Sequence, residues 1–478
     1  MFQKTIILIH RYLGIGIGLL MILWCVSGIV MMYVQYPEMD ERNRLASQED
    51  IYLNECCNLS ENLSVKFIPV NSFQIEMMSN IPVLHIDGIR LPVNLKTGTW
   101  ITDIDLQQAK EIAETYKIQR NLNGVLEYLG EIHNDQWTVY SRYNRHRPLH
   151  YFSLNNDLGT ELYISSNNGH VVQETTRNQR FWNWIGSVSH WLYFTKLREH
   201  TYLWSQTVIW LTIVGIFLTV VGIYLGIRQF NFTTTKSRYS PYKGWHLWHH
   251  YFGLIFGLFT LTWIASGLFS MNPWGAFESE GYYRESKQLQ GNPMYWEDIK
   301  ELVQSFQNMQ LPPNTKLIEV FTRFGRPEVI FHRNSGQTLR YDSESWQQKS
   351  MSHNDWDSII SSLQPGTSIA EAGIINEEDT YYYSHHEEKK FPVYRVIFNN
   401  DEQTRYYLDV TSGRILDKID NNSKWSRWVF TALHRGDFAK IIRTRPIWDI
   451  MMLFLLSGVT TVCYTGFHMG LKRVRLIR

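Results

Sequence analysis

Four long apolar runs interrupt an otherwise polar chain. They cover residues 13–33, 202–227, 251–270 and 447–469. A helix that crosses the core of a bilayer needs about 20 consecutive, mostly apolar residues, so each run predicts one transmembrane helix. The first run is too long for the apolar part of a signal peptide and lacks a small-residue cleavage site. We therefore interpret it as a membrane anchor.

The segments outside these runs differ in length and charge, and this difference predicts an orientation. Basic residues gather at the N-terminus, between the second and third runs, and at the C-terminus: Lys4, Arg11, Arg228, Lys236, Arg238, Lys243, Lys472, Arg473, Arg475 and Arg478. The positive-inside rule places these short segments, and so both termini, in the cytoplasm. Two long polar segments, near 38–200 and 272–446, then lie on the periplasmic side of a bacterial inner membrane.

The two parts of the chain resemble each other. Residues 10–28 read HRYLGIGIGLLMILWCVSG and residues 249–267 read HHYFGLIFGLFTLTWIASG, at an offset of 239. Residues 148–169 align with 392–413 at an offset of 244. Each of these two stretches predicts a β-hairpin, because apolar and aromatic residues flank a polar turn. Internal similarity of this kind indicates a duplicated unit.

The offset of 244 continues as far as Phe194 and Phe438, and then becomes 240 in the second and fourth runs, where Tyr224 matches Tyr464. The predicted fold class is an integral membrane protein, mostly α-helical, with a four-helix transmembrane bundle of two pseudo-symmetric halves. Each half carries a periplasmic α+β domain. The predicted boundaries are 1–36 (N-terminus and first transmembrane helix), 37–180 (first periplasmic domain), 181–228 (His-bearing helix and second transmembrane helix), 229–245 (cytoplasmic loop), 246–271 (third transmembrane helix), 272–424 (second periplasmic domain) and 425–478 (His-bearing helix, fourth transmembrane helix and tail).

Composition excludes several classes of function. The formal net charge of +1 argues against a nucleic-acid-binding surface, which needs clustered basic residues. The four Cys residues have no metal-binding or redox spacing, and no CxxCH motif for covalent haem attachment is present. Adjacent Cys56 and Cys57 can oxidise to a disulfide outside the cytosol.

Most of the 17 His residues lie in the polar segments, where the simplest interpretation is a solvated or structural side chain: His85, His133, His146, His150, His170, His332, His353, His385 and His386. None of these aligns with a second His in the other half. His385 and His386, next to Glu387 and Glu388, offer an alternative metal-binding cluster.

Two pairs of His do recur in both halves. His10 and His249 begin the first and third runs, and His190 and His434 precede the second and fourth runs. Each pair should lie at one depth, with its members facing each other across the bundle. Two imidazoles in this arrangement are the ligands of a bis-histidine haem b. The sequence therefore predicts two haem b groups, with these four His as axial iron ligands.

Other interpretations of these positions stay open. Interfacial His also form hydrogen bonds at headgroup depth, and His246, His250 and His468 compete as ligands although they have no counterparts. Glycines at Gly14, Gly18, Gly253 and Gly257 recur four residues apart. They flatten one helix face, either to admit a porphyrin or to pack helices closely. Aromatic residues near the outer pair are interpreted mainly as interfacial anchors: Trp182, Trp184, Trp191, Trp425 and Trp428.

The chain resembles the PepSY-associated transmembrane family, which includes iron-regulated membrane proteins and ferric-siderophore reductases. The resemblance rests on residues 10–14 (HRYLG), 189–192 (SHWL), 161–172 (ELYISSNNGHVV) and 406–416 (YYLDVTSGRIL). It implies PepSY-like periplasmic domains and two haems that carry electrons across the inner membrane. The implied substrate is a ferric siderophore or another Fe(III) chelate.

The second half departs from the SHWL motif, because residues 433–437 read LHRGD. This change places Arg435 beside the outer haem, where it is expected to pair with a propionate. The chain has no flavin or nicotinamide motif, so the expected reductant is a cytoplasmic flavoprotein or a quinol. Two rival functions remain: a haem-free PepSY regulator or sensor that binds peptidases or peptides, and a transporter, which the sparse intramembrane charges disfavour.

Overall fold

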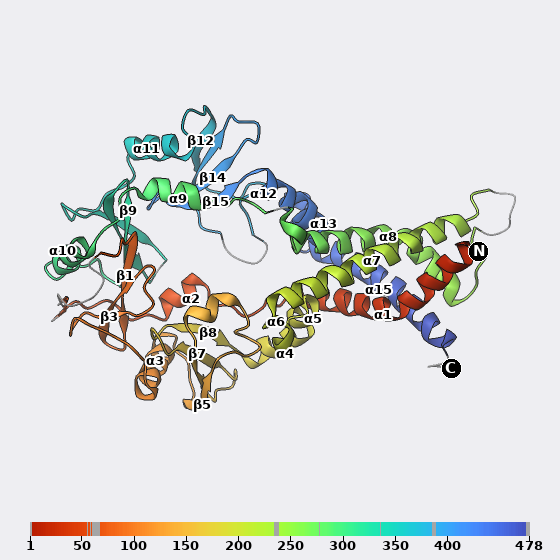
Figure 1. Cartoon of the computed structure of the whole chain (residues 1–478), viewed down its shortest axis with the longest axis horizontal. Helices are drawn as coiled ribbons and strands as arrows, with labels where there is room; N and C mark the ends of the chain where they lie inside the picture. Colours follow the sequence, from red (N-terminus) through yellow and green to blue (C-terminus); the bar gives the residue numbers. More distant parts are fainter. Residues whose placement is uncertain are drawn as a thin grey trace.

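The computed structural model describes residues 2–54, 56–57, 59, 67–233, 239–276, 278–334, 336–384 and 389–474. The chain forms a long helical stalk and a head that contains the β-sheets (Figure 1). The predicted metal cluster at residues 385–388 lies outside the described residues. Four of the basic residues that predict the orientation also lie outside the described residues: Lys236, Arg238, Arg475 and Arg478.

The stalk consists of the described helices that are long and apolar enough to cross a membrane: α1 (Phe2–Met31), α7 (Thr201–Gln229), α8 (Trp245–Ser270) and α15 (Ile447–Arg473). Helix α1 packs along α15, and α8 packs against both α7 and α15. These helices coincide with the four apolar runs and confirm that each run forms one long helix. Each extends past its run into polar flanks, because backbone hydrogen bonding continues beyond the apolar core.

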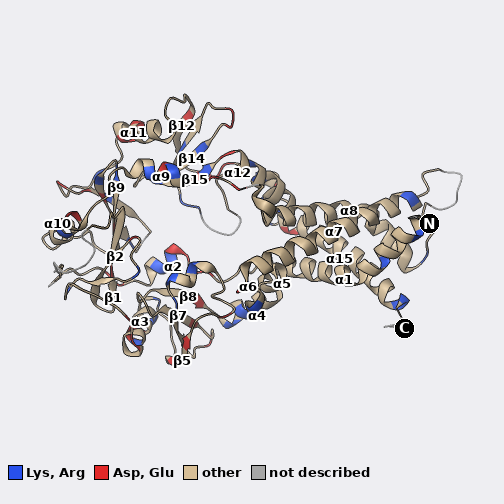
Figure 2. Ribbon diagram, in the orientation of Figure 1, with Lys and Arg blue, Asp and Glu red and all other residues tan. Residues whose placement is uncertain are grey.

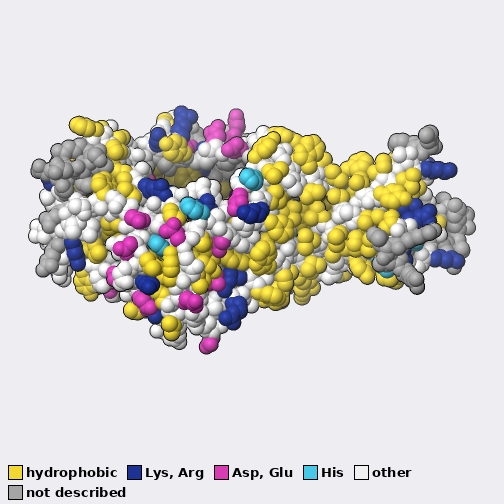
Figure 3. Space-filling view, turned by 60° about the horizontal axis from the view of Figure 1, so that its bottom comes forward, with side chains coloured by type: hydrophobic (Ala, Val, Ile, Leu, Met, Phe, Trp, Pro, Cys, Tyr) yellow, Lys and Arg dark blue, Asp and Glu magenta, His cyan; other side chains and the backbone are white. Residues whose placement is uncertain are grey.

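The surface of the stalk is that of a membrane protein. Large apolar side chains such as Leu19, Phe217, Ile255 and Phe454 are exposed on it, and Figure 3 shows a nearly continuous hydrophobic surface along its length. A soluble protein rarely exposes an apolar area of this extent. Both termini lie at the end of the stalk farthest from the head (Figure 1), where Lys and Arg gather and acidic residues are scarce (Figure 2).

Two four-stranded antiparallel sheets lie beside the stalk end of the head, one from each long polar segment (Figure 1). Their strands are β5 (Glu127–Ile132), β6 (Leu149–Ser153), β7 (Glu161–Ser165) and β8 (Val171–Thr175), and β12 (Ile369–Ile375), β13 (Val393–Phe398), β14 (Arg405–Asp409) and β15 (Ile415–Ile419). The pairs β6–β7 and β13–β14 are antiparallel. They confirm the two predicted hairpins.

A third sheet has seven strands and takes them from both segments, in the order β11-β10-β9-β1-β2-β3-β4. The strands are β1 (Ser72–Met78), β2 (Ile81–Ile86), β3 (Val93–Asn94), β4 (Thr99–Trp100), β9 (Thr315–Arg323), β10 (Arg326–Arg333) and β11 (Thr338–Asp342). Strands β1 and β9 pair antiparallel at its centre, with Ile75 opposite Ile318. The predicted boundaries 37–180 and 272–424 did not anticipate this shared sheet.

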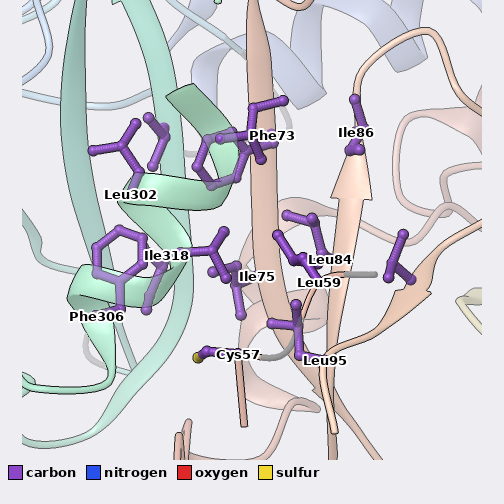
Figure 4. Close-up of a cluster of buried hydrophobic side chains, with 14 of the residues drawn as sticks. Cys57, Leu59, Phe73, Ile75, Leu84, Ile86, Leu95, Leu302, Phe306 and Ile318 are labelled. Atoms are coloured by element: carbon purple, nitrogen blue, oxygen red, sulfur yellow. The ribbon is translucent and has the colours of Figure 1, made fainter. Parts of the chain in front are cut away.

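The remaining described helices of the head are α2 (Glu41–Ala46), α3 (Leu106–Gln119), η1 (Ser141–Arg145), η2 (Pro273–Gly275), α9 (Tyr283–Gln290), α10 (Trp296–Phe306) and α11 (His353–Leu363). Helix α10 buries Leu302 and Phe306 against Phe73, Ile75 and Ile318 of the shared sheet (Figure 4). One hydrophobic core therefore joins the two segments. Cys56 and Cys57 border this core and form a disulfide with each other.

Short helices link each four-stranded sheet to the stalk. They are α4 (Arg177–Ile185), α5 (Ser187–Trp191) and α6 (Thr195–Arg198) before α7, and α12 (Asn421–Trp425), η3 (Ser426–Ala432), α13 (Leu433–Arg435) and α14 (Lys440–Arg443) before α15. The segment η3 is a π-helix, a rare conformation that is frequent at functional sites. A left-handed residue ends each His-bearing helix, Leu192 after α5 and Gly436 after α13. This residue reverses the backbone after the His.

Candidate functional site

The four His residues predicted as iron ligands form two facing pairs. His10 of α1 and His249 of α8 have ring centroids 6.3 Å apart, with ring planes tilted by 48°. His190 of α5 and His434 of α13 have centroids 6.2 Å apart, with an angle of 74° between planes. The first pair lies near the termini, and the second lies near the head. We refer to them as the inner pair and the outer pair.

Both separations fit one iron atom between two imidazoles. An imidazole nitrogen binds a metal at about 2 Å, so two rings on opposite sides of one iron have centroids about 6 Å apart. Direct hydrogen bonding between two rings would bring them closer than this. The residues present at both pairs therefore fit bis-histidine ligation.

Each of the four His rings also interacts with the backbone of a neighbouring transmembrane helix, which leaves Nε2 to face the other ring. His190 Nδ1 lies 3.1 Å from the Trp24 carbonyl, and His434 Nδ1 lies 3.2 Å from the Trp263 carbonyl. His249 Nδ1 lies 3.1 Å from the Val462 carbonyl. A proton on Nδ1 that is donated to a carbonyl leaves Nε2 as the metal-binding nitrogen. His10 has the equivalent backbone hydrogen bond, to Leu218 of α7.

Hydroxyl groups complete the support of these rings. Ser27 Oγ lies 3.0 Å from His190 Nδ1, and Ser266 Oγ lies 3.1 Å from His434 Nδ1. Each Ser also donates to the same carbonyl as its His. Each ring is thus fixed by a neighbouring transmembrane helix, which limits its rotation away from the facing His.

Glycines let the inner pair approach the neighbouring helices. A Cβ on Gly222 of α7 would lie 2.7 Å from His10 Cε1, and a Cβ on Gly466 of α15 would lie 2.9 Å from His249 Cε1. Real Cβ atoms do not approach other atoms this closely. The outer pair is less tight, since a Cβ on Gly28 or on Gly267 would lie 3.6 Å from the nearest His carbon.

The four glycines that recur four residues apart do not all have the same surroundings. Two of them leave open space, and two allow close helix packing. A Cβ on Gly14 or Gly253 would meet nothing within 4 Å, which leaves open space next to the inner pair's helices. A Cβ on Gly18 would contact Phe467, and a Cβ on Gly257 would lie 3.0 Å from Ile223. The first two therefore leave space, and the second two allow close helix packing.

These contacts show that the offset of 244 persists in the second and fourth transmembrane helices, in place of the expected 240. Gly222 and Gly466 contact equivalent His residues and are 244 apart. Trp204 donates to the Trp191 carbonyl at 2.8 Å, and Trp448 donates to the Arg435 carbonyl at 2.6 Å. A few identical residues at an offset of 240 suggested a different alignment of these two helices. For that reason the sequence did not indicate the contacts of Gly222 and Gly466 with the His rings.

The competing His residues are occupied elsewhere or lie apart from the inner pair. His250 contacts the Ser240 hydroxyl through Nδ1 at 2.7 Å and the Gly226 carbonyl through Nε2 at 2.8 Å. His246 stacks on Tyr242, and His468 lies against Trp245. Only His10 and His249, among the described His at this end of the stalk, face each other as a ring pair.

The outer pair lines a cavity of about 710 Å³ between the His-bearing helices and the stalk. This volume is within the range of cofactor pockets, roughly 300–1,000 Å³. Trp24, Trp263, Gly28 and Gly267 also line it. The cavity adjoins both rings of the outer pair, so it offers room for a flat group between them.

Arg435 lines this cavity and also a second, more polar one of about 370 Å³. Its guanidinium lies 5.6 Å from the centre of the Phe430 ring. Neighbouring Asp437 is fully buried and pairs with Arg427 at 3.3 Å and Arg443 at 3.9 Å. Asp437 therefore anchors the chain after α13, whereas Arg435 borders both cavities.

Most of the tryptophans near the outer pair are exposed. Trp182, Trp184, Trp425 and Trp428 have 39–60% of their surface exposed, which agrees with interfacial anchors. Trp191 instead packs in a buried aromatic cluster with Tyr36 and Tyr193 and also lines the cavity.

Comparison with known proteins places the chain in a family. No curated protein matches it. The sequence model of the PepSY-associated TM region family matches residues 90–473, which extend from the first polar segment to the end of α15. The chain is a membrane protein and belongs to the PepSY-associated TM region family.

Proposed function

We propose that this protein is a di-haem b electron-transfer protein of the bacterial inner membrane that reduces a periplasmic ferric siderophore or similar Fe(III) chelate. The observation that carries the proposal is the presence of two facing His pairs, one at each end of the transmembrane stalk. When bound, the two haems supply one-electron chemistry, and bis-histidine ligation leaves no open iron position for oxygen.

The positions of the pairs suit transfer across a bilayer. His10 lies on α1, and Gly28 of the same helix contacts His190 of the outer pair. Gly28 lies 18 positions after His10 on the helix, and a rise of 1.5 Å per residue gives about 27 Å along the axis. A bilayer core is about 30 Å thick. One pair therefore serves each side, with the basic end of the stalk in the cytoplasm and the head in the periplasm.

The paired halves give the duplication a chemical reason. Each pair takes one His from each half, so neither half completes a bis-histidine site by itself. We infer that the halves are pseudo-symmetric repeats whose association creates both sites. The shared seven-stranded sheet holds the halves together in the head.

The acceptor side has features that suit an Fe(III) chelate. The polar cavity of about 370 Å³ is lined by the phenols of Tyr381 and Tyr383, the guanidiniums of Arg427 and Arg435 and one carboxylate, Asp417, among others. Cationic and phenolic groups suit a ligand rich in anionic oxygens. One electron converts Fe(III) to Fe(II), which hard oxygen ligands bind weakly. The electron comes from a cytoplasmic flavoprotein or a quinol.

The colour and haem content of the purified full chain test the proposal. Protein from haem-replete cells should show a Soret band, sharp α-bands on reduction and two haems per chain. His10→Ala and His190→Ala should each retain one haem, and His250→Ala, the matched control at the inner end, should retain two. The reduced protein should be reoxidised without oxygen by a ferric chelate, with release of Fe(II) to a chromophoric chelator. Colourless protein from the same cells would overturn the proposal and favour a haem-free PepSY regulator.

A further inference from the structure

A second cluster of potential metal ligands lies in the head, far along the chain from the stalk. Glu76 is on β1, His85 is on β2, and His170 immediately precedes β8. Their ligand atoms lie within 4.8 Å of one another. The cluster thus joins the shared seven-stranded sheet to the four-stranded sheet of the first half. From the sequence alone, both His were expected to be solvated or structural. The β1–β2 hairpin and the β7–β8 turn bring them together.

The atoms converge at ion-pair distances. Glu76 Oε1 lies 3.0 Å from His85 Nε2 and 2.6 Å from His170 Nε2. Both Nε2 atoms are buried, and both approach the same carboxylate oxygen, so three potential ligand atoms gather at one point.

The other carboxylate oxygen of Glu76 is already occupied. Oε2 accepts from Arg44 at 3.4 Å and from the Gln48 side-chain amide. These contacts orient the carboxylate so that Oε1 faces the two imidazoles. The nearby His146 is engaged elsewhere, since its Nδ1 contacts Asn168 and its Nε2 accepts from Arg145. The ligand set is thus one carboxylate and two imidazoles.

The second half holds the same arrangement with one substitution. Glu319 occupies on β9 the place of Glu76 on β1, and His332 on β10 occupies the place of His85, because their strand registers match. His170 is replaced by Arg414, which immediately precedes β15. The prediction that no His of the polar segments recurs in both halves was therefore wrong, because His85 and His332 are equivalent.

In the second half, protein groups alone satisfy the carboxylate. Arg414 donates to Glu319 Oε1 at 2.6 Å, and His332 Nε2 forms an aligned hydrogen bond with Glu319 Oε2 at 3.0 Å. The guanidinium is a permanent cation at that position. The first half has an imidazole there instead, so the ligand atoms of Glu76, His85 and His170 gather at the place that the Arg414 cation takes in the second half.

We propose that Glu76, His85 and His170 bind one divalent transition-metal cation of the Zn²⁺ type. Two imidazoles and a carboxylate are a common zinc ligand set with a fourth position open to water. The cation takes the structural place of the Arg414 guanidinium and ties the β7–β8 turn to the shared sheet. This site is independent of the haem proposal, because all three ligands lie in the head.

Zinc titration of the full chain, after treatment with a chelator, tests this site. Wild-type protein should bind one more Zn²⁺ per chain than His170→Arg, in competition with a chromophoric chelator. His170→Arg copies the second-half arrangement, so it should keep the fold and its thermal stability. Glu76→Gln should weaken the same Zn²⁺ by about 100-fold or more. His332→Gln is the matched control and should not change the stoichiometry.

The reciprocal variant distinguishes a loss of ligands from a loss of zinc binding caused by misfolding. Arg414→His recreates the first-half ligand set in the second half and should gain one Zn²⁺ per chain. Cobalt in place of zinc should give the visible absorption of a low-symmetry site in wild type, absent in His170→Arg. Equal zinc stoichiometry in wild type, His170→Arg and Arg414→His would overturn the proposal.

Discussion

His10 of α1 lies directly against Gly222 of α7, where an added Cβ would be 2.7 Å from the imidazole Cε1. His249 and Gly466 repeat this relationship in the second half, at 2.9 Å. The absence of a side chain at these glycines allows the Cε1 edge of each imidazole to approach the backbone of the neighbouring helix. The position of the inner pair therefore depends on two residues that bind nothing themselves.

Gly222→Ala should displace His10 and weaken haem binding at the inner pair only. Overpacking costs about 1–3 kcal/mol, which corresponds to about a 5- to 150-fold loss of affinity. Haem content and the α-band spectrum of the purified protein measure the effect. Gly16→Ala is the control, because Gly16 is exposed and a Cβ there meets nothing within 4 Å. An inner haem unaffected by Gly222→Ala would contradict the predicted contact.

Ser266→Ala should raise the midpoint potential of the outer haem. The Ser266 hydroxyl lies 3.1 Å from His434 Nδ1, and such contacts make a ligating imidazole more electron-rich, which stabilises Fe(III). A redox titration with optical detection measures the shift. Ser270→Ala is the control on the same helix, since its hydroxyl donates to the Gly267 carbonyl and has no hydrogen bond to an imidazole in the described part of the chain. A shift of equal size in both variants would argue against a role for Ser266.

Asp437→Asn should destabilise the link between α13 and α15. Asp437 is fully buried between Arg427 and Arg443, and removal of one partner from a buried ion pair costs about 3–5 kcal/mol. Thermal unfolding monitored by circular dichroism measures the loss. Lys440→Ala provides the comparison, because the Lys440–Glu377 pair is exposed and such pairs contribute about 0–1 kcal/mol. Similar melting temperatures for both variants would contradict this difference.

Stability of the head should fall at acidic pH through Glu319. Burial raises the pKa of the Glu319 carboxyl, but hydrogen bonding to His332 and the charge of Arg414 outweigh it and depress the pKa far below its usual value. A carboxyl whose pKa is depressed in the folded state stabilises the fold above its unfolded pKa of about 4.3, and the contribution is lost as pH falls further.

Glu319→Gln should therefore lower stability at pH 7 by about 3 kcal/mol and flatten the decline of the melting temperature below about pH 4.3. Melting curves between neutral and acidic pH measure both effects. Glu344→Gln, in the exposed turn after β11, serves as the control. Parallel pH profiles for wild type and Glu319→Gln would show that this carboxyl does not contribute.

Much of the candidate haem site could be predicted from sequence. The His pairs were found because each lies at a matched position of a repeated segment, and helical apolar runs fix the depth of such residues. The support around the rings was less accessible. Gly222, Gly466 and the serines depend on which helix faces which ring, and partial identities at an offset of 240 suggested a register that the contacts do not follow.

The sequence by itself determined the four membrane helices, the two hairpins and the internal similarity, because each of these follows from local periodicity and length. Only the tertiary structure decided that β1 pairs with β9 in one shared sheet, with Ile75 opposite Ile318. It also decided that Glu76, His85 and His170 converge. Strand pairing between distant segments depends on how the whole chain closes around a common core, and no local pattern of residues encodes it.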